Sequence, residues 1–155
     1  MKKYSFLTFV LGCLMLPLAA EAALAISNLR SLAFGTFAAG KGGSLSIAPD
    51  DTRSKTGGVT LISIGTANSA AFLVSDDDPA NAQRAYTIVL PDDDQVSISN
   101  GSTSIRVTNF VSLPAYQGRL TEGSQILRVG ATLQAVDGLP PGDYAGTFSV
   151  TVIYQ

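Results

Sequence analysis

Aspartates gather in three short clusters, and they are the residues of this sequence best suited to chemistry. The clusters comprise Asp50 and Asp51, residues 76–78, and residues 92–94. Calcium binds several oxygen ligands, so loops at one end of a β-sandwich could pool two such clusters into a site. No calcium-loop spacing is present, however, and aspartate beside proline is ordinary turn chemistry. The sequence therefore favours solvated turns and leaves, as candidate calcium ligands, Asp76, Asp77, Asp78, Asp92, Asp93 and Asp94.

The residues on which most enzymes rely are scarce. The chain has no His and no Trp, and its single cysteine, Cys13, precedes the expected mature start at residue 23. Ser-His-Asp and Cys-His catalysis and His- or Cys-ligated metals are thereby excluded from the mature chain. Glu122 is the one glutamate after residue 22, and each aspartate falls in a predicted turn, which disfavours a glycosidase-type carboxylate pair. We predict a protein that is not an enzyme and needs no cofactor.

The first 22 residues have the pattern of a secretory signal peptide. Lys2 and Lys3 give a positive start, residues 5–20 form an apolar run, and Ala20-Glu21-Ala22 supplies the cleavage pattern. The apolar run is shorter than a membrane span needs, and Pro17 and Glu21 interrupt it. We expect a cleaved leader helix with cleavage after Ala22, or alternatively after Ala25, and no membrane span in the mature chain. The predicted location is the periplasm, the cell surface or the extracellular medium.

The mature chain has the size and charge of one acidic domain, residues 23–155. The full chain has 10 Lys and Arg against 12 Asp and Glu, and loss of Lys2, Lys3 and Glu21 leaves 8 against 11. A net charge near −3 lacks the basic patch that nucleic-acid binding needs, so no nucleic-acid partner is expected.

The elements that position these residues are predicted to be β-strands, most clearly at the C-terminal end. Between Tyr144 and Tyr154 apolar residues alternate with small polar ones, and a Pro-Pro-Gly turn precedes them. Elsewhere turn signals recur every 8–12 residues or so, which favours an antiparallel two-sheet sandwich of the immunoglobulin type. The predicted strands are residues 23–34 with a bulge near Asn28, 44–47, 59–64, 70–75, 85–90, 96–99, 104–111 with a bulge at Phe110, 125–136 and 144–154.

Two turns are predicted from glycine. Residues 40–43, Gly-Lys-Gly-Gly, are expected to form a hairpin loop. Asn100-Gly101 predicts a two-residue hairpin between alternating runs.

Four motifs together resemble a bacterial exported family, the domain of unknown function 4402. They are LAFGTF at 32–37, GGVTL at 57–61, VTNF at 107–110 and GDYAGTFSVTV at 142–152. The last motif is also similar to the end of spore-coat-protein-U-like domains and of chaperone–usher pilins. In those proteins an immunoglobulin-like subunit lacks its final strand, and the N-terminal extension of a neighbour completes it. The resemblance implies a pilin-like sandwich, a secreted or surface structural role, and no catalytic residue.

Two hypotheses for function follow. In the first, the protein is a fibre subunit assembled by strand complementation with copies of itself or with a periplasmic chaperone. Residues 23–30 then donate Leu24 and Ile26, and the accepting last strand presents Phe148, Val150, Val152 and Tyr154. In the second, residues 23–32 pair within their own chain, and the self-complete sandwich is a carbohydrate- or calcium-binding module. Tyr144 is interpreted as a structural corner, and Tyr116 as a candidate for surface contact.

Overall fold

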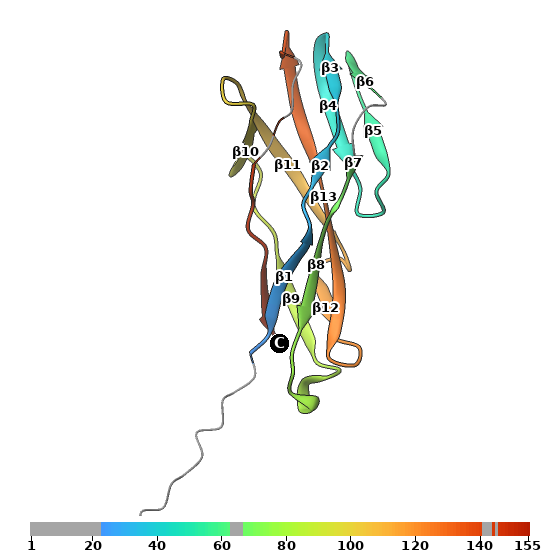
Figure 1. Cartoon of the computed structure of the whole chain (residues 1–155), viewed down its shortest axis with the longest axis vertical. Coiled ribbons are helices and arrows are strands. Elements are labelled where there is room, and N and C mark those ends of the chain that lie inside the picture. The colour runs from blue at the N-terminus through green and yellow to red at the C-terminus, as the bar shows by residue number, and fades with distance from the viewer. Residues whose placement is uncertain (1–22, 63–66, 141–143, 145) are drawn as a thin grey trace, which may run out of the picture.

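The longest strand, β13 (Ser124–Asp137), organises the larger of two sheets (Figure 1). The structure, a computed structural model, describes residues 23–62, 67–140, 144 and 146–155. The predicted leader and its cleavage site at Ala22 lie outside these residues. Along one edge, the first half of β13 pairs with β8 and its second half with β4, while β11 covers the other edge. A strand of this length therefore spans both halves of an elongated molecule.

Every strand pair is antiparallel, and the two sheets face each other as a sandwich, which confirms the predicted all-β class. The larger sheet consists of β1 (Ala25–Arg30), β8 (Ala70–Ser75), β13, β11 (Ser104–Leu113) and β10 (Val96–Ser99). β4 (Lys41–Ile47) pairs with the second half of β13, and β5 (Arg53–Lys55) pairs with β4. The smaller sheet has the order β12 (Gln117–Arg119), β9 (Ala85–Val89) and β14 (Thr151–Tyr154). Two short pairs complete the fold: β2 (Ala33–Phe34) with β7 (Ala67–Asn68), and β3 (Phe37–Ala39) with β6 (Val59–Leu61). A single 3-10 turn, Pro79–Asn81, is the one helical element in the described ranges.

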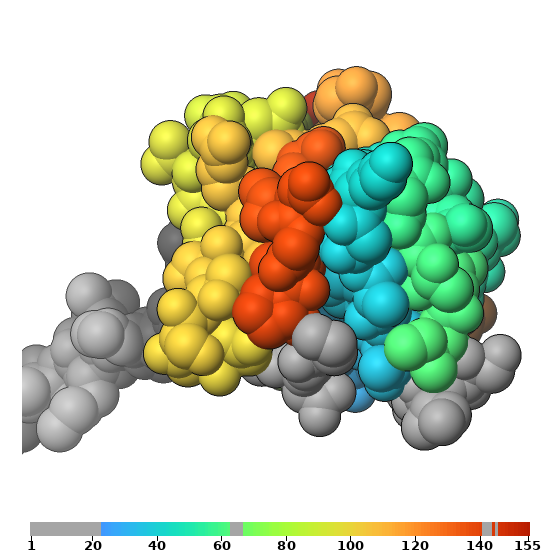
Figure 2. Space-filling model, turned by 90° about the horizontal axis from the view of Figure 1, so that it is seen from above, coloured from blue at the N-terminus to red at the C-terminus, as the bar shows by residue number. Residues whose placement is uncertain are grey.

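Two apolar clusters fill the sandwich, one in each half. The upper cluster includes Phe37, Leu45 and Leu133, and the lower one includes Tyr86 and Leu127, all almost fully buried. Figure 2, seen down the upper end, shows the β10–β11 turn, the end of β13 and the β3–β4 region side by side. Because strand side chains alternate between faces, each strand contributes its apolar residues to these clusters and its polar ones to solvent.

The clusters meet at Phe148, which packs on both. Its ring lies 5.1 Å from Phe110 and 6.1 Å from Phe72 between centroids. Phe148, Val150, Val152 and Tyr154 are all half-buried, whereas Thr147, Ser149 and Thr151 are exposed. The predicted inward face of the last strand is therefore confirmed.

The predicted length of that strand is wrong. Only Thr151–Tyr154 forms a ladder, with β9, and residues 146–150 approach the core without one. The alternating pattern reports which side chains are buried, but it does not show whether a neighbouring backbone is present to pair with.

Both glycine turns need correction. Residues 40–43 do not make a hairpin, because β3 pairs with β6 whereas β4, which already begins at Lys41, pairs with β13 and β5. Gly43, at φ 145°, instead lets its backbone pass against the Thr56 carbonyl, where a Cβ would collide. The β10–β11 hairpin is present, but its loop has four residues, since Ser99 pairs with Ser104 and Asn100 N–H donates to the Thr103 carbonyl at 3.2 Å.

Other predictions of local structure are confirmed. Strands 70–75 and 96–99 have the predicted bounds, and register shifts interrupt the ladders at the expected bulges near Asn28 and Phe110. Asp137, predicted to lie in a turn, is instead the last residue of β13, where it pairs with Lys41.

Gly118 supplies a test of the lower cluster, because it lies directly across from the buried Tyr86 in the β12–β9 ladder. A Cβ on Gly118 would overlap the Tyr86 ring and its hydroxyl, which donates to Gln125 Oε1 at 2.7 Å. We expect Gly118→Ala to lower the free energy of unfolding by about 1–3 kcal/mol in urea denaturation. Gly40→Ala is the control, since its Cβ would have one neighbour within 4 Å, at an ordinary 3.4 Å. Equal stabilities of the two variants would contradict this account of the cluster.

Candidate functional site

The two sheets leave an open seam, defined here as the space between β1 and the last segment, residues 146–154. Among the described residues, β1 ends the larger sheet and pairs only with β8, and β14 ends the smaller sheet and pairs only with β9. The two strands lie side by side without pairing (Figure 1). Leu24 and Ile26 from one side and Val152 and Tyr154 from the other pack on the same lower cluster. The structure thus brings together the predicted donor residues and the predicted accepting strand.

The backbone of the last segment faces this seam with unused hydrogen-bonding groups. Gln155 donates its N–H to the Ala85 carbonyl of β9 at 3.3 Å. Because successive N–H groups of a strand point to opposite sides, those of Val152 and Tyr154 point away from β9. Within the described residues, 146–150 make no backbone–backbone hydrogen bond at all. An edge of this kind is a template for another strand.

A groove with uncharged walls continues the seam into the upper half. It has a volume of about 270 Å³, and its lining includes Leu32, Phe34, Ile98, Val107, Phe110 and Phe148. None of its lining side chains is charged. Uncharged walls beside unpaired backbone suit the addition of an extended segment.

β1 itself is held in place by few apolar contacts. Ala25, Ser27, Asn28 and Leu29 are exposed, and the flanking Leu24 and the central Ile26 are only half-buried. Five register pairs with β8, from Ala25 with Ser75 to Arg30 with Ala71, hold its backbone. β1 completes the sheet of its own chain here, and it cannot complete a neighbour's sheet at the same time.

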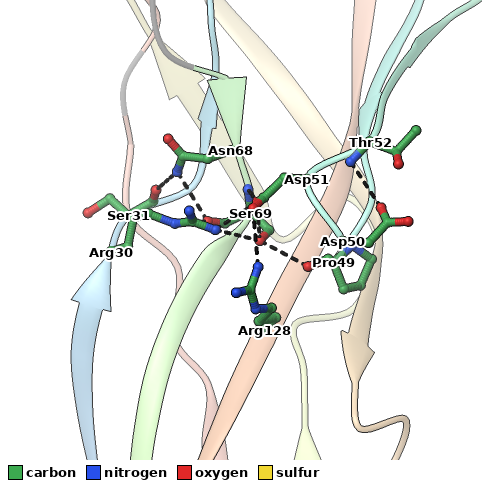
Figure 3. Close-up of polar contacts among 9 residues, drawn as sticks. All are labelled: Arg30, Ser31, Pro49, Asp50, Asp51, Thr52, Asn68, Ser69 and Arg128. Atoms are coloured by element: carbon green, nitrogen blue, oxygen red, sulfur yellow. Dashed lines mark hydrogen bonds and ion pairs between the residues drawn. The ribbon is translucent and has the colours of Figure 1, made fainter.

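A polar cluster fixes the upper end of β1 (Figure 3). The Arg30 guanidinium donates from Nη2 to Asp51 Oδ1 at 2.7 Å and from Nε to the Ser69 carbonyl at 3.0 Å. From β13, Arg128 Nη1 donates to Asp51 Oδ2 at 3.1 Å. Ala71 lies between the two arginines in the register, so they share one face of the sheet with only a methyl group between them. Asp51 therefore bridges two cations from two strands.

Groups other than Arg30 also hold the Asp51 carboxylate in position. The fully buried Ser69 donates its N–H and its hydroxyl to Asp51 Oδ1 at 2.8 and 2.7 Å. A tight turn holds the Asp51 backbone, with its N–H donating to the Ala48 carbonyl at 3.0 Å. These bonds from Ser69, followed by the Arg30 bond and charge, outweigh partial burial and hold the pKa of Asp51 well below its usual range.

Because of this lowered pKa, the free energy of unfolding depends on pH in the acidic range. Because the folded pKa of Asp51 is lowered, its contribution is present above the unfolded pKa, about 3.9, and is lost as pH falls toward the folded value. We expect the free energy of unfolding to fall below about pH 4 in the parent chain and to fall less steeply in Asp51→Asn. Chemical denaturation along a pH series measures both slopes. Asp77→Asn, which alters an exposed side chain, serves as the control. The account would be refuted if the free energy of unfolding of Asp51→Asn fell with pH as steeply as that of the parent chain.

A second polar contact fixes the end of the chain. The Tyr154 hydroxyl donates to Asp76 Oδ2, and the Arg84 guanidinium lies 4.2 Å from the centre of the Tyr154 ring. Burial, and then the bond to Asp76, raise the pKa of Tyr154 to about 12. The same hydrogen bond, with those from the Asp78 N–H and the Asn81 amide, lowers the pKa of Asp76. The last strand is thereby tied to the end of β8.

Removing the Tyr154 hydroxyl tests this tie. Tyr154→Phe leaves the buried Asp76 with one donor fewer. We therefore expect a lower melting temperature than for Tyr144→Phe, whose hydroxyl donates to the carbonyl of the exposed Pro140. The raised pKa also predicts that the stability of the parent chain falls as pH rises from 10.0 toward 12. In Tyr154→Phe we expect this fall to be smaller. Thermal unfolding across that range checks both outcomes. Identical curves for Tyr154→Phe and Tyr144→Phe would rule out the tie.

The acidic clusters of the sequence have separate roles. Asp76 bonds to its own loop and to Tyr154, whereas Asp77 is exposed; Asp78 caps the 3-10 turn through the Ala80 N–H at 2.9 Å. Asp93 accepts from the Asn109 N–H, and Asp94 lies 3.3 Å from Arg106; Asp92 accepts from the Gln95 N–H through its backbone carbonyl. In the described ranges no three carboxylate, His or Cys groups are placed to share a metal ion.

Arg30, Ser69 and Arg128 were not among the predicted site residues, and Asp51 was interpreted as a turn. The available signal is Arg30, a charge at the end of an otherwise uncharged strand. Tyr144 does behave as a corner, since its hydroxyl donates to the carbonyl of Pro140 at 2.7 Å. Tyr116 is 83% exposed, at φ 59°, and contributes to no core.

Fold and seam together define an antiparallel β-sandwich with an open edge at its last strand. The chain belongs to the family described as domain of unknown function DUF4402, whose model matches residues 24–154. Searches of the curated proteins and of the solved structures found no match. The described residues include no helix long and apolar enough to cross a membrane.

Proposed function

We propose that this protein is an exported, non-enzymatic structural subunit that assembles with copies of itself by β-strand complementation at the seam. The observation that carries the proposal is the seam, where β1 is held on β8 by few apolar contacts beside a last segment whose outer backbone edge has no partner in the described chain. Residues 1–22 support export. A periplasmic chaperone that adds a strand to the same edge fits the proposal as a transient partner.

The strand exchanged between copies is β1. Leu24 and Ile26 are only half-buried, so their transfer from water contributes about 1–2 kcal/mol each. A neighbour's β1 would remake the same ladder with β8 and the same contacts, so exchange costs mainly the entropy of association. The short connection to β2, Ser31 and Leu32, acts as the hinge.

A cysteine pair distinguishes exchange from a self-complete sandwich. Ala25 and Ser75 are direct register partners, and residues 23–155 contain no other cysteine. We expect Ala25→Cys with Ser75→Cys, in the chain from residue 23 onward, to give a ladder of covalent oligomers on non-reducing gels. Each single variant serves as a control and can form no species larger than a dimer.

A monomeric mass at all concentrations, with a single internal disulfide and cooperative unfolding, would overturn the proposal. Ile26→Asp should abolish the ladder, because it introduces a charge onto the lower cluster. Leu29→Asp, at a side chain that is 55% exposed, should retain it.

A further inference from the structure

Register is weakly specified by the apolar residues of β1. Leu24 and Ile26 are two residues apart, and strand side chains repeat with a period of two. A slip of two residues would move Leu24 to the position of Ile26 and keep the same face inward. Some other contact must therefore select the register in which Ala25 meets Ser75.

The cluster around Asp51 has the properties of such a contact. Its acceptors are the Asp51 carboxylate and the Ser69 carbonyl, which receive two nitrogens of one guanidinium at 2.7 and 3.0 Å. This fork-like geometry suits arginine and cannot be reproduced by the ammonium of lysine. Arg30 is also the only charged residue between positions 23 and 40, so one position of the strand fits the site.

The acceptors are held by residues that lie outside the strand. Ser69 is fully buried and directs its N–H and hydroxyl at Asp51, and Arg128 holds the second carboxylate oxygen. Ser69 directly precedes β8, the turn of Asp51 follows β4, and Arg128 belongs to β13. None of these residues lies on β1, so the site is preorganised for an incoming guanidinium.

We infer that Asp51 and Ser69, supported by Arg128, form a docking site for the guanidinium of Arg30 from a second copy, and that this site sets the register of the exchanged β1. The inference rests on the proposed function. It assigns the ligand of the site, an arginine that ends an otherwise uncharged strand. Arg128 is a positioning residue, because it acts on the ligand through Asp51.

Mixing two variants tests whether the contact forms between copies. Asp51→Asn keeps a normal Arg30 but a defective site, and Arg30→Gln keeps a normal site but a defective strand. Each variant alone should associate about tenfold more weakly than the parent chain, the effect of losing a hydrogen bond to a charged group. In the mixture, the native contact can form only between different chains. We expect the mixture to form a one-to-one complex, measured by light scattering with one variant labelled.

A second experiment measures the register of β1 against β8. Ala25→Cys with Leu73→Cys cross-links only if β1 slips by two residues in this direction, because Leu73 pairs with Ser27 in the native ladder and the slip brings Ala25 to the position of Ser27. We expect this pair to remain reduced in the parent background and to cross-link when Arg30→Gln or Arg30→Lys is added. Arg106→Gln is the matched control, since it removes an exposed ion pair with Asp94 that lies away from β1.

The outcomes separate the two proposals. If the parent chain assembles but the mixture gives no complex, or the slipped pair stays reduced in Arg30→Gln, the docking site is wrong and strand exchange stands. If the parent chain gives no ladder through Ala25 and Ser75, strand exchange fails, and the docking site between copies fails with it.

Discussion

Backbone hydrogen bonds that the last segment leaves unmade are the constraint on which this structure depends. Phe148, Val150, Val152 and Tyr154 need a covered interior, so the segment must lie against the core. Its outer edge then faces an opening that the smaller sheet has no further strand to fill. β1 covers part of the apolar surface from the opposite sheet but does not pair with the edge. The molecule is thus complete in its core and incomplete in its hydrogen bonding, which is the condition under which strand addition stabilises an assembly.

β13 explains why the polar cluster lies where it does. β8 ends its pairing with β13 at Ala70 and Val129, and β4 begins its own at Ile47 and Ala131. The start of β8 and the turn after β4 therefore arrive at the same point along β13. Ser69 and Asp51 meet there, and Arg30 reaches them because β1 ends opposite Ala71. The cluster joins four segments at the junction of the two halves.

How far the sequence predicts this fold depends on how local each signal is. Alternation placed β10 at its observed bounds, because a strand with one buried face records that burial in its own residues, and an apolar run ended by three aspartates placed β8. The glycines at 40–43 were misread as a turn, because a glycine needed for close approach to Thr56 looks the same as one needed for a turn. Asp51 was read as a turn residue, which it is, while its second role depends on Ser69 and Arg128, at sequence separations of 18 and 77.

The sequence by itself determined the all-β class, the inward face of the last strand and the family, because period-two patterns and local motifs carry that information. Only the tertiary structure decided that β1 and β14 end different sheets side by side, and that Arg30 meets a carboxylate already held by a buried serine. Pairing partners are chosen by long-range burial and by the register of distant strands, and these leave little trace in the residues of any one segment.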